Sequence, residues 1–91
     1  MVTYLKSDLT KLIKYKDISV TTTSTQYDGW YVATFDTGLS NPNKIINVSV
    51  IGSDNNHAAF VGYYHTTTGQ GRVNCVAANT TVYLRVWYIN I

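Results

Sequence analysis

Hydrophobic and polar positions alternate with a period of two along most of the chain after residue 16. Successive side chains of an extended strand point to opposite faces, so this period is typical of β-strands. Threonine, valine, isoleucine and tyrosine, which favour strands, dominate the same region. The pattern predicts six strands, at residues 17–25, 30–36, 44–51, 57–64, 72–77 and 80–90.

Short segments rich in glycine, asparagine, aspartate or proline separate the expected strands, as at residues 27–29 and 38–43. Short antiparallel strands joined by such turns build a two-layer fold. We therefore expect a mostly β chain that forms a small antiparallel β-sandwich of jelly-roll-like type. If the connections alternate in direction, the turns near residues 28, 54 and 78 lie at one end of the sandwich.

The N-terminal segment has a different period, because its leucine and valine residues recur at a spacing of three and four. That spacing matches the a and d positions of a heptad and predicts a short amphipathic helix. Isolated helices of fewer than ~12–15 residues are marginal in water, so the helix either packs on its own domain or ends a longer coiled-coil stalk. We expect a helical stalk end at residues 1–16 and a β-sandwich head at residues 17–91. The helical seam consists of Val2, Leu5, Leu9 and Leu12.

The last expected strand is apolar on both of its faces. A strand with one face in water normally alternates between apolar and polar residues. The second face of this strand is therefore either covered within the domain or buried against another subunit. We place Val82, Leu84 and Val86 in the core of the domain. We place Trp87, Ile89 and Ile91 at an oligomer interface.

Composition narrows the function classes. The 91 residues suffice for one small domain, and the single cysteine, Cys75, excludes an intrachain disulfide and is expected to be a buried apolar residue. The net charge is only +2, and four of the lysines lie where the helix would expose them to solvent, so we expect no nucleic-acid partner. No run of apolar residues reaches the ~18 that a membrane span requires, so we expect no membrane insertion.

Both ends of the chain together resemble a known family. A heptad helix runs into Leu12-Ile-Lys-Tyr-Lys-Asp-Ile-Ser-Val20, a threonine-rich strand follows, and a Val82-Tyr-Leu-Arg-Val-Trp-Tyr-Ile89 strand closes the protein. This layout resembles the C-terminal tip of bacteriophage or prophage tail fibres, the receptor-binding proteins of the virion. The resemblance implies an extracellular homotrimer, in which a three-stranded coiled-coil stalk leads into three β-sandwich heads that recognise a bacterial surface glycan or protein.

The resemblance assigns no receptor-binding residue and no metal. Receptor contacts differ widely among such tips, so none is transferred to a position of this chain. Some tips bind an axial metal through closely spaced His-X-His residues, whereas His57 and His65 are eight residues apart here. We therefore expect no metal on a three-fold axis and no cofactor.

Catalytic patterns are missing from the sequence. Glycoside hydrolysis usually requires two carboxylates at a set separation, and the five aspartates show no such spacing. The sequence contains no Gly-X-Ser-X-Gly elbow and no phosphate-binding glycine loop in a helix context. The loop at residues 54–57 offers one carboxylate, fewer than a calcium loop needs, and is typical of a polar turn. We therefore expect no enzymatic activity.

Aromatic residues suggest glycan binding. The chain has eight tyrosines, two tryptophans and two phenylalanines, several of them beside polar residues at turns. Sugars stack their apolar faces on rings and bind planar polar groups through their hydroxyls. The alternative is that Trp30 and Tyr63 belong to the core or to an interface. The expected ligand-binding residues are Tyr27, Asp28, Trp30, Asp54, Asn55, Asn56 and His57, and a further mixed cluster lies at Tyr63-Tyr64-His65.

These patterns favour a non-enzymatic tip of a phage tail fibre that recognises a bacterial surface glycan as a homotrimer. Two alternatives share most of the same features. One is a structural domain that trimerises or caps a fibre and binds no ligand. The other is a monomeric bacterial carbohydrate-binding module.

Overall fold

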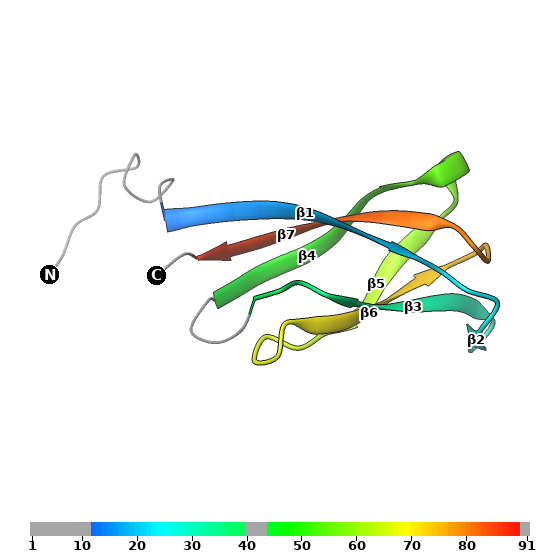
Figure 1. Cartoon of the computed structure of the whole chain (residues 1–91), viewed down its shortest axis with the longest axis horizontal. Helices are drawn as coiled ribbons and strands as arrows, with labels where there is room; N and C mark the ends of the chain where they lie inside the picture. The colour runs from blue at the N-terminus through cyan, green and yellow to red at the C-terminus, as the bar shows by residue number, and fades with distance from the viewer. Residues whose placement is uncertain (1–11, 40–43, 90–91) are drawn as a thin grey trace, which may run out of the picture.

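The computed structural model describes residues 12–39 and 44–89, which form a small sandwich of two antiparallel sheets (Figure 1). Sheet A has three strands, in the spatial order β1 (Ile13–Thr21), β7 (Thr81–Ile89) and β4 (Lys44–Ser53). Sheet B has four strands, in the order β2 (Gln26–Tyr27), β3 (Trp30–Asp36), β6 (Gln70–Cys75) and β5 (Ala59–Tyr64). A short 3₁₀ helix, η1 (Asp54–Asn56), connects β4 to β5. The mostly β sandwich expected from the sequence is confirmed.

The core lies between the two sheets and is built by alternate residues of the central strands. From β7, Val82, Leu84 and Val86 are fully buried, as the alternation predicts. From β6, Val73 and Cys75 are fully buried in the same cluster. Residues at the intervening positions of both strands therefore face outward, and they form the two outer faces of the sandwich.

The passage from sheet A to sheet B is fixed by a buried threonine. Thr22 follows β1 directly, and its hydroxyl donates a hydrogen bond of 2.9 Å to the carbonyl of Ala77. The backbone N–H of Thr80 donates to the same hydroxyl at 3.0 Å. These bonds tie the end of β1 to the β6–β7 loop, because a buried hydroxyl needs such partners.

The start of β1 corrects the expected helix boundary. Residues 13–16 belong to a strand, so the prediction of a helix through residue 16 is wrong there. Ile13 and Tyr15 pair with Ile89 and Trp87 of β7, and this long antiparallel ladder offers more hydrogen bonds than a final helical turn. Leu12 is described and exposed, whereas Val2, Leu5, Leu9 and Ile91 lie outside the described residues.

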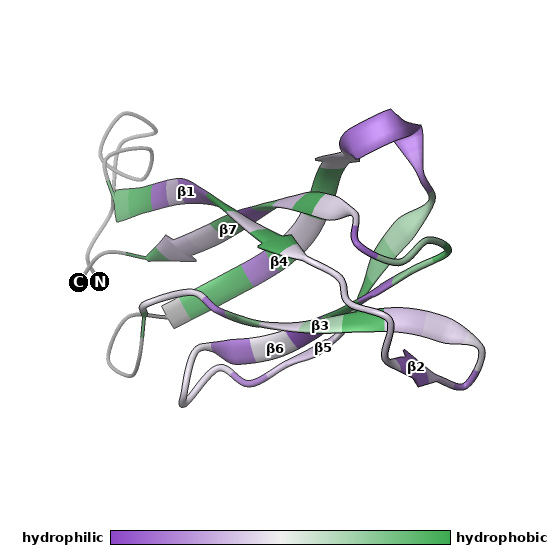
Figure 2. Ribbon diagram, turned by 45° about the vertical axis from the view of Figure 1, so that its right-hand side comes forward, coloured by the Kyte–Doolittle hydropathy of each residue, from purple (hydrophilic) through white to green (hydrophobic). Residues whose placement is uncertain are grey.

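The strand count also differs from the expectation. The first strand ends at Thr21 instead of residue 25, and Gln26–Tyr27 forms a separate short strand, so the described part of the chain has seven strands. The turns are placed as expected: the β2–β3 turn, η1 and the β6–β7 turn lie at one end, and the β5–β6 turn lies at the other (Figure 1). Figure 2 shows η1 as a strongly hydrophilic segment at the first of these ends.

Candidate functional site

The outer face of sheet B gathers aromatic side chains from three strands. Phe60 and Tyr63 of β5 stand opposite Asn74 and Arg72 of β6. A strict alternation from the inward-facing Val61 would turn Tyr63 inward, but a β-bulge between the two residues shifts the register. Tyr63 therefore faces solvent with 43% of its surface exposed. We call this surface the aromatic face; its residues are Tyr27, Trp30, Phe60, Tyr63, Arg72 and Asn74.

Trp30 and Phe60 form the apolar part of the aromatic face. Their ring centroids lie 4.9 Å apart with an interplanar angle of 87°, an edge-to-face arrangement that aromatic pairs prefer. The two rings belong to β3 and β5, which flank β6 on either side. They therefore meet over the outer side of β6, the strand between them.

Arg72 is held between two tyrosine rings. Its guanidinium carbon lies 4.6 Å from the ring centroid of Tyr27 and 5.1 Å from that of Tyr63, within the range of cation–π attraction. No ion pair involves Arg72 among residues 12–39 and 44–89. Its Nε atom is buried and has no hydrogen-bond partner there.

Asn74 presents a second polar atom without a partner on the same face. The residue is only 7% exposed, and its Oδ1 accepts no hydrogen bond from the described residues. Gly62 of β5 lies directly beside it, because a Cβ at that glycine would stand 3.0 Å from Oδ1. Buried polar atoms are nearly always paired, because leaving one without a hydrogen bond costs about 1–3 kcal/mol.

A hollow of about 430 Å³ adjoins the aromatic face at the end that carries the β5–β6 turn. Its lining mixes polar side chains with the rings of Phe35, Tyr63 and His65, and the Tyr63 and His65 rings lie 5.3 Å apart. Asp36 Oδ1 accepts a hydrogen bond of 2.8 Å from the backbone N–H of Gly38. The residues around the hollow are Thr34, Phe35, Asp36, Tyr63, His65, Gln70 and Gly71.

The structure brings together only part of the expected ligand-binding set. Tyr27 and Trp30 both belong to the aromatic face, and Tyr63 and His65 line the hollow beside it. Asp28 occupies the β2–β3 turn with a positive φ of 51°, followed by Gly29 with a φ of 83°. Positive φ at both central positions is typical of a type I′ hairpin turn, so backbone geometry already accounts for Asp28 and Gly29.

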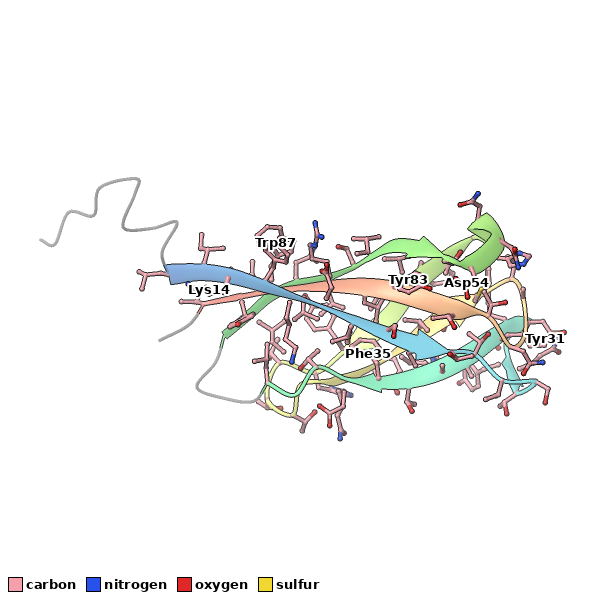
Figure 3. All side chains as sticks on the ribbon, turned by 45° about the horizontal axis from the view of Figure 1, so that its top comes forward. Lys14, Tyr31, Phe35, Asp54, Tyr83 and Trp87 are labelled. Carbon is pink, nitrogen blue, oxygen red and sulfur yellow. The ribbon has the colours of Figure 1, made fainter. Side chains whose placement is uncertain are left out.

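The second expected cluster, at residues 54–57, has different neighbours. Asp54 Oδ1 accepts a hydrogen bond of 2.9 Å from the Tyr83 hydroxyl of sheet A, and this bond raises the pKa of Tyr83 (Figure 3). Asn55 and Asn56 have φ values of 60° and 54°, and the carbonyl of His57 accepts a hydrogen bond from the Ser53 hydroxyl. These residues share one end of the sandwich with Tyr27 and Trp30, but their contacts lie toward sheet A.

Sequence reasoning missed Phe60, Arg72, Asn74 and the polar lining of the hollow. One signal was available: Arg72 and Asn74 alternate with the apolar Val73 and Cys75 and so share the outward face of their strand. The partners of these residues depend on strand order and on the bulge near Gly62. Neither feature follows from the period of the sequence.

The outer face of sheet A carries a second cluster, which we call the sheet A face. Tyr15 and Trp87 rings lie 4.9 Å apart, and Trp87 projects away from Phe35 between the sheets (Figure 3). Arg85 lies 4.5 Å from the Tyr15 ring and donates two hydrogen bonds, of 2.8 and 3.0 Å, to the carboxylate of Asp17. These bonds lower the pKa of Asp17 and raise that of Arg85.

The rest of the sheet A face combines exposed apolar side chains with polar ones, such as Asn47, which pairs with Trp87. Ile13 and Ile89 pair next to Tyr15 and Trp87, and Ile13 is exposed. Two register shifts in β4 leave Ile46 and Ile51 exposed as well. The expected interface residues Trp87 and Ile89 are thus partly buried members of this outer surface.

Within residues 12–39 and 44–89, no three histidine, cysteine or acidic side chains lie close enough to hold a metal ion. None of the helices in that same portion has the length and apolar character to cross a membrane.

Comparisons with known proteins identify no match. No family model fits the sequence, and no curated protein and no solved structure is significantly similar to it. The functional assignment therefore depends on the residues of the two outer faces.

Proposed function

We propose that this domain is the non-enzymatic receptor-binding tip of a phage tail fibre, and that it binds a bacterial surface glycan as a homotrimer. The aromatic face is the observation that supports glycan binding best. It combines exposed rings, an arginine and an amide oxygen that has no partner in the described part of the chain with an adjoining polar hollow.

The chemistry of the aromatic face suits a sugar. The apolar face of a pyranose ring can stack on Tyr63, which borders the hollow. Its hydroxyls can bond to Thr34, Asp36 and Gln70, because hydroxyls donate and accept at once. A hollow of about 430 Å³ falls within the range of small-molecule sites, roughly 300–1,000 Å³.

The lining of the hollow favours binding without cleavage. Glycosidases of the usual kinds place two carboxylates on either side of the scissile bond. Among residues 12–39 and 44–89, Asp36 is the single carboxylate that borders the hollow, and Asp54 belongs to the contacts of Tyr83. A second catalytic carboxylate is therefore missing from the lining.

The fibre part of the proposal rests on the sheet A face and on the strand order. The apolar surface around Tyr15 and Trp87 suits contact with further copies of the chain. β1 pairs with β7, β3 pairs with β6, and β4 leads into β5, the wrapped order expected of a jelly-roll-like head. A coiled-coil stalk would then lie before Ile13, where β1 begins.

A glycan array probed with the purified chain tests the receptor part. We expect binding to a restricted set of bacterial glycans, and we expect Trp30→Ala and Tyr63→Ala to weaken it at least about tenfold, because each removes a stacking ring. Lys14→Gln, a change outside the aromatic face, serves as the control. If an assembled oligomer binds no glycan and no bacterial surface, the receptor function is wrong.

A structural cap without a ligand is the second candidate, and the sheet A face favours it independently. Such a domain needs only the apolar contacts around Trp87 to hold a fibre together. Under this alternative, Tyr27→Ala, Trp30→Ala and Asn56→Ala leave attachment to host cells unchanged. Weaker attachment of the first two variants excludes a purely structural role.

A further inference from the structure

We propose that the ligand of the aromatic face is an acidic glycan, and that its carboxylate or phosphate group binds to Arg72. This inference rests on the proposed glycan-binding function and names the class of sugar. Hexuronic acids and phosphodiester-linked polyols both supply the required anion, and the experiment below separates them.

The charge of Arg72 has no counterion in the described part of the chain. Residues 12–39 and 44–89 form a single ion pair, and it belongs to Arg85 and Asp17. Tyrosine rings stabilise a guanidinium through their π faces but do not neutralise its charge. Arg72 therefore retains a full positive charge at the surface of the sandwich.

Two tyrosine rings hold the Arg72 side chain in place before any ligand binds. Tyr27 and Tyr63 approach its guanidinium from two sides, at 4.6 and 5.1 Å. A guanidinium that is already held in place loses less freedom when it binds, and its planar fork matches two oxygens of a carboxylate or phosphate. The buried Nε has no hydrogen-bond partner in the described residues, so this donor of the fork is not committed to another group there.

Positive and negative charge lie at different places along sheet B. Arg72 stands opposite Thr34 in the sheet, whereas Asp36 stands opposite Gln70, beside the hollow. Asp36 repels an anion and accepts hydrogen bonds from hydroxyls. The acidic group is thus oriented toward Arg72, and the hydroxyl-rich part of the sugar occupies the hollow.

Side-chain NMR of the arginine Nε–H groups tests the inference directly. We expect glucuronate or inorganic phosphate to shift the Arg72 resonance, while the Arg85 resonance, already paired with Asp17, stays in place. Glucose is expected to shift Arg72 much less than glucuronate. A larger response to glucuronate assigns a carboxylated sugar, and a larger response to phosphate assigns a phosphodiester polymer.

Each of the other possible results contradicts one defined part of the proposal. Equal shifts with glucose and glucuronate leave the glycan function intact and reject the acidic class. Shifts with phosphate and acetate but with no sugar retain an anion site and reject the glycan. If Arg72 responds to none of these probes, the inference is wrong.

Affinity measurements on paired glycans provide the second readout. Each acidic glycan is compared with its carboxyl-reduced or dephosphorylated counterpart, which has the same backbone without the charge. We expect Arg72→Gln to weaken binding to the acidic form about 10- to 100-fold and to reduce the preference for the acidic form over its neutral counterpart, since a charge-assisted hydrogen bond is lost. Arg72→Lys keeps the charge but loses the fork, so its loss is smaller, and Lys14→Gln controls for net charge. Equal affinity for charged and neutral partners contradicts the proposal.

Discussion

On the sheet A face, Arg85 lies 4.5 Å from the ring of Tyr15 and is paired through two hydrogen bonds with Asp17. On the aromatic face, Arg72 lies between the rings of Tyr27 and Tyr63 and has no ion pair within residues 12–39 and 44–89. Both clusters stack an arginine on tyrosine, but only one of them contains its own counterion. Stacked rings alone therefore do not distinguish a binding face from an assembly face.

This difference suits the two faces to different kinds of contact. The centre of a protein–protein interface is depleted of unpaired charge, because desolvating such a charge is costly. The paired Arg85, which lies over the Tyr15 ring beside Trp87, fits that description. A free arginine beside polar side chains instead suits a small charged ligand that supplies the missing partner.

The largest expected effect comes from the core that lies between the two faces. Leu84 of β7 is fully buried between the sheets, so Leu84→Ala should lower the free energy of unfolding by about 2–5 kcal/mol. Denaturant unfolding measures this loss, and Leu84→Met, which keeps the volume, should cost less than about 1.5 kcal/mol. A loss below about 1 kcal/mol for the alanine variant would show that β7 does not organise the common core.

The second-largest expected effect shows which of the two faces takes part in self-association. Trp87→Lys places a charge at the centre of the sheet A face and should weaken self-association by at least about 30-fold, as expected for a hot-spot residue. Sedimentation measures the mass of the variant across a concentration series. Phe60→Lys, on the opposite face, should leave the mass unchanged. If Phe60→Lys dissociates the oligomer and Trp87→Lys does not, the assignment of the two faces is reversed.

The sequence predicted the inner side of the sandwich better than its outer side. Val82, Leu84 and Val86 were placed correctly because burial imposes a period of two on β7. The start of β1 was misplaced because the heptad spacing was extended past Leu12, although Ile13 and Tyr15 already alternate with lysines. A long pairing partner in β7 decides between helix and strand there, and that partner lies about 70 residues away in sequence.

The candidate site was only partly predictable for a related reason. Tyr27 and Trp30 were recognised by composition, since rings beside a turn are visible in the sequence. Arg72 was not, because its position between Tyr27 and Tyr63 requires the order β2-β3-β6-β5 and the bulge after Val61. The different fates of two similar arginines depend on whether a carboxylate stands at the paired position, as Asp17 does for Arg85.

A smaller effect is expected from the ring that covers Arg72. Tyr27→Ala removes one of its two cation–π contacts, so the guanidinium becomes less ordered, and affinity for an acidic glycan should fall several-fold. Tyr27→Phe keeps the ring and should retain most of the affinity, which titration calorimetry can measure. Equal losses in the two variants would indicate that the tyrosine hydroxyl, and not the ring, matters.

The substitution with the smallest expected effect on stability is Asp17→Asn, which should also make the two faces more alike. Asp17→Asn removes the carboxylate that pairs with Arg85, and the cost is small because both side chains are partly exposed and screened by solvent. The hydrogen bond from Arg85 holds the pKa of Asp17 below its usual value of 3.8. The ion pair therefore stabilises the fold above that pH, and its contribution is lost as the pH falls through the lowered pKa.

Unfolding midpoints measured over a range of acidic pH check this sign: wild type should exceed Asp17→Asn near neutral pH, and the two should converge in strong acid. The variant should also make the Arg85 Nε–H resonance respond to phosphate, as proposed for Arg72, because both arginines then lack a counterion among the described residues. An Arg85 that stays silent in Asp17→Asn would mean that the missing carboxylate is not what distinguishes the two faces. The buried Nε and the two flanking rings of Arg72 would then have to account for any anion binding there.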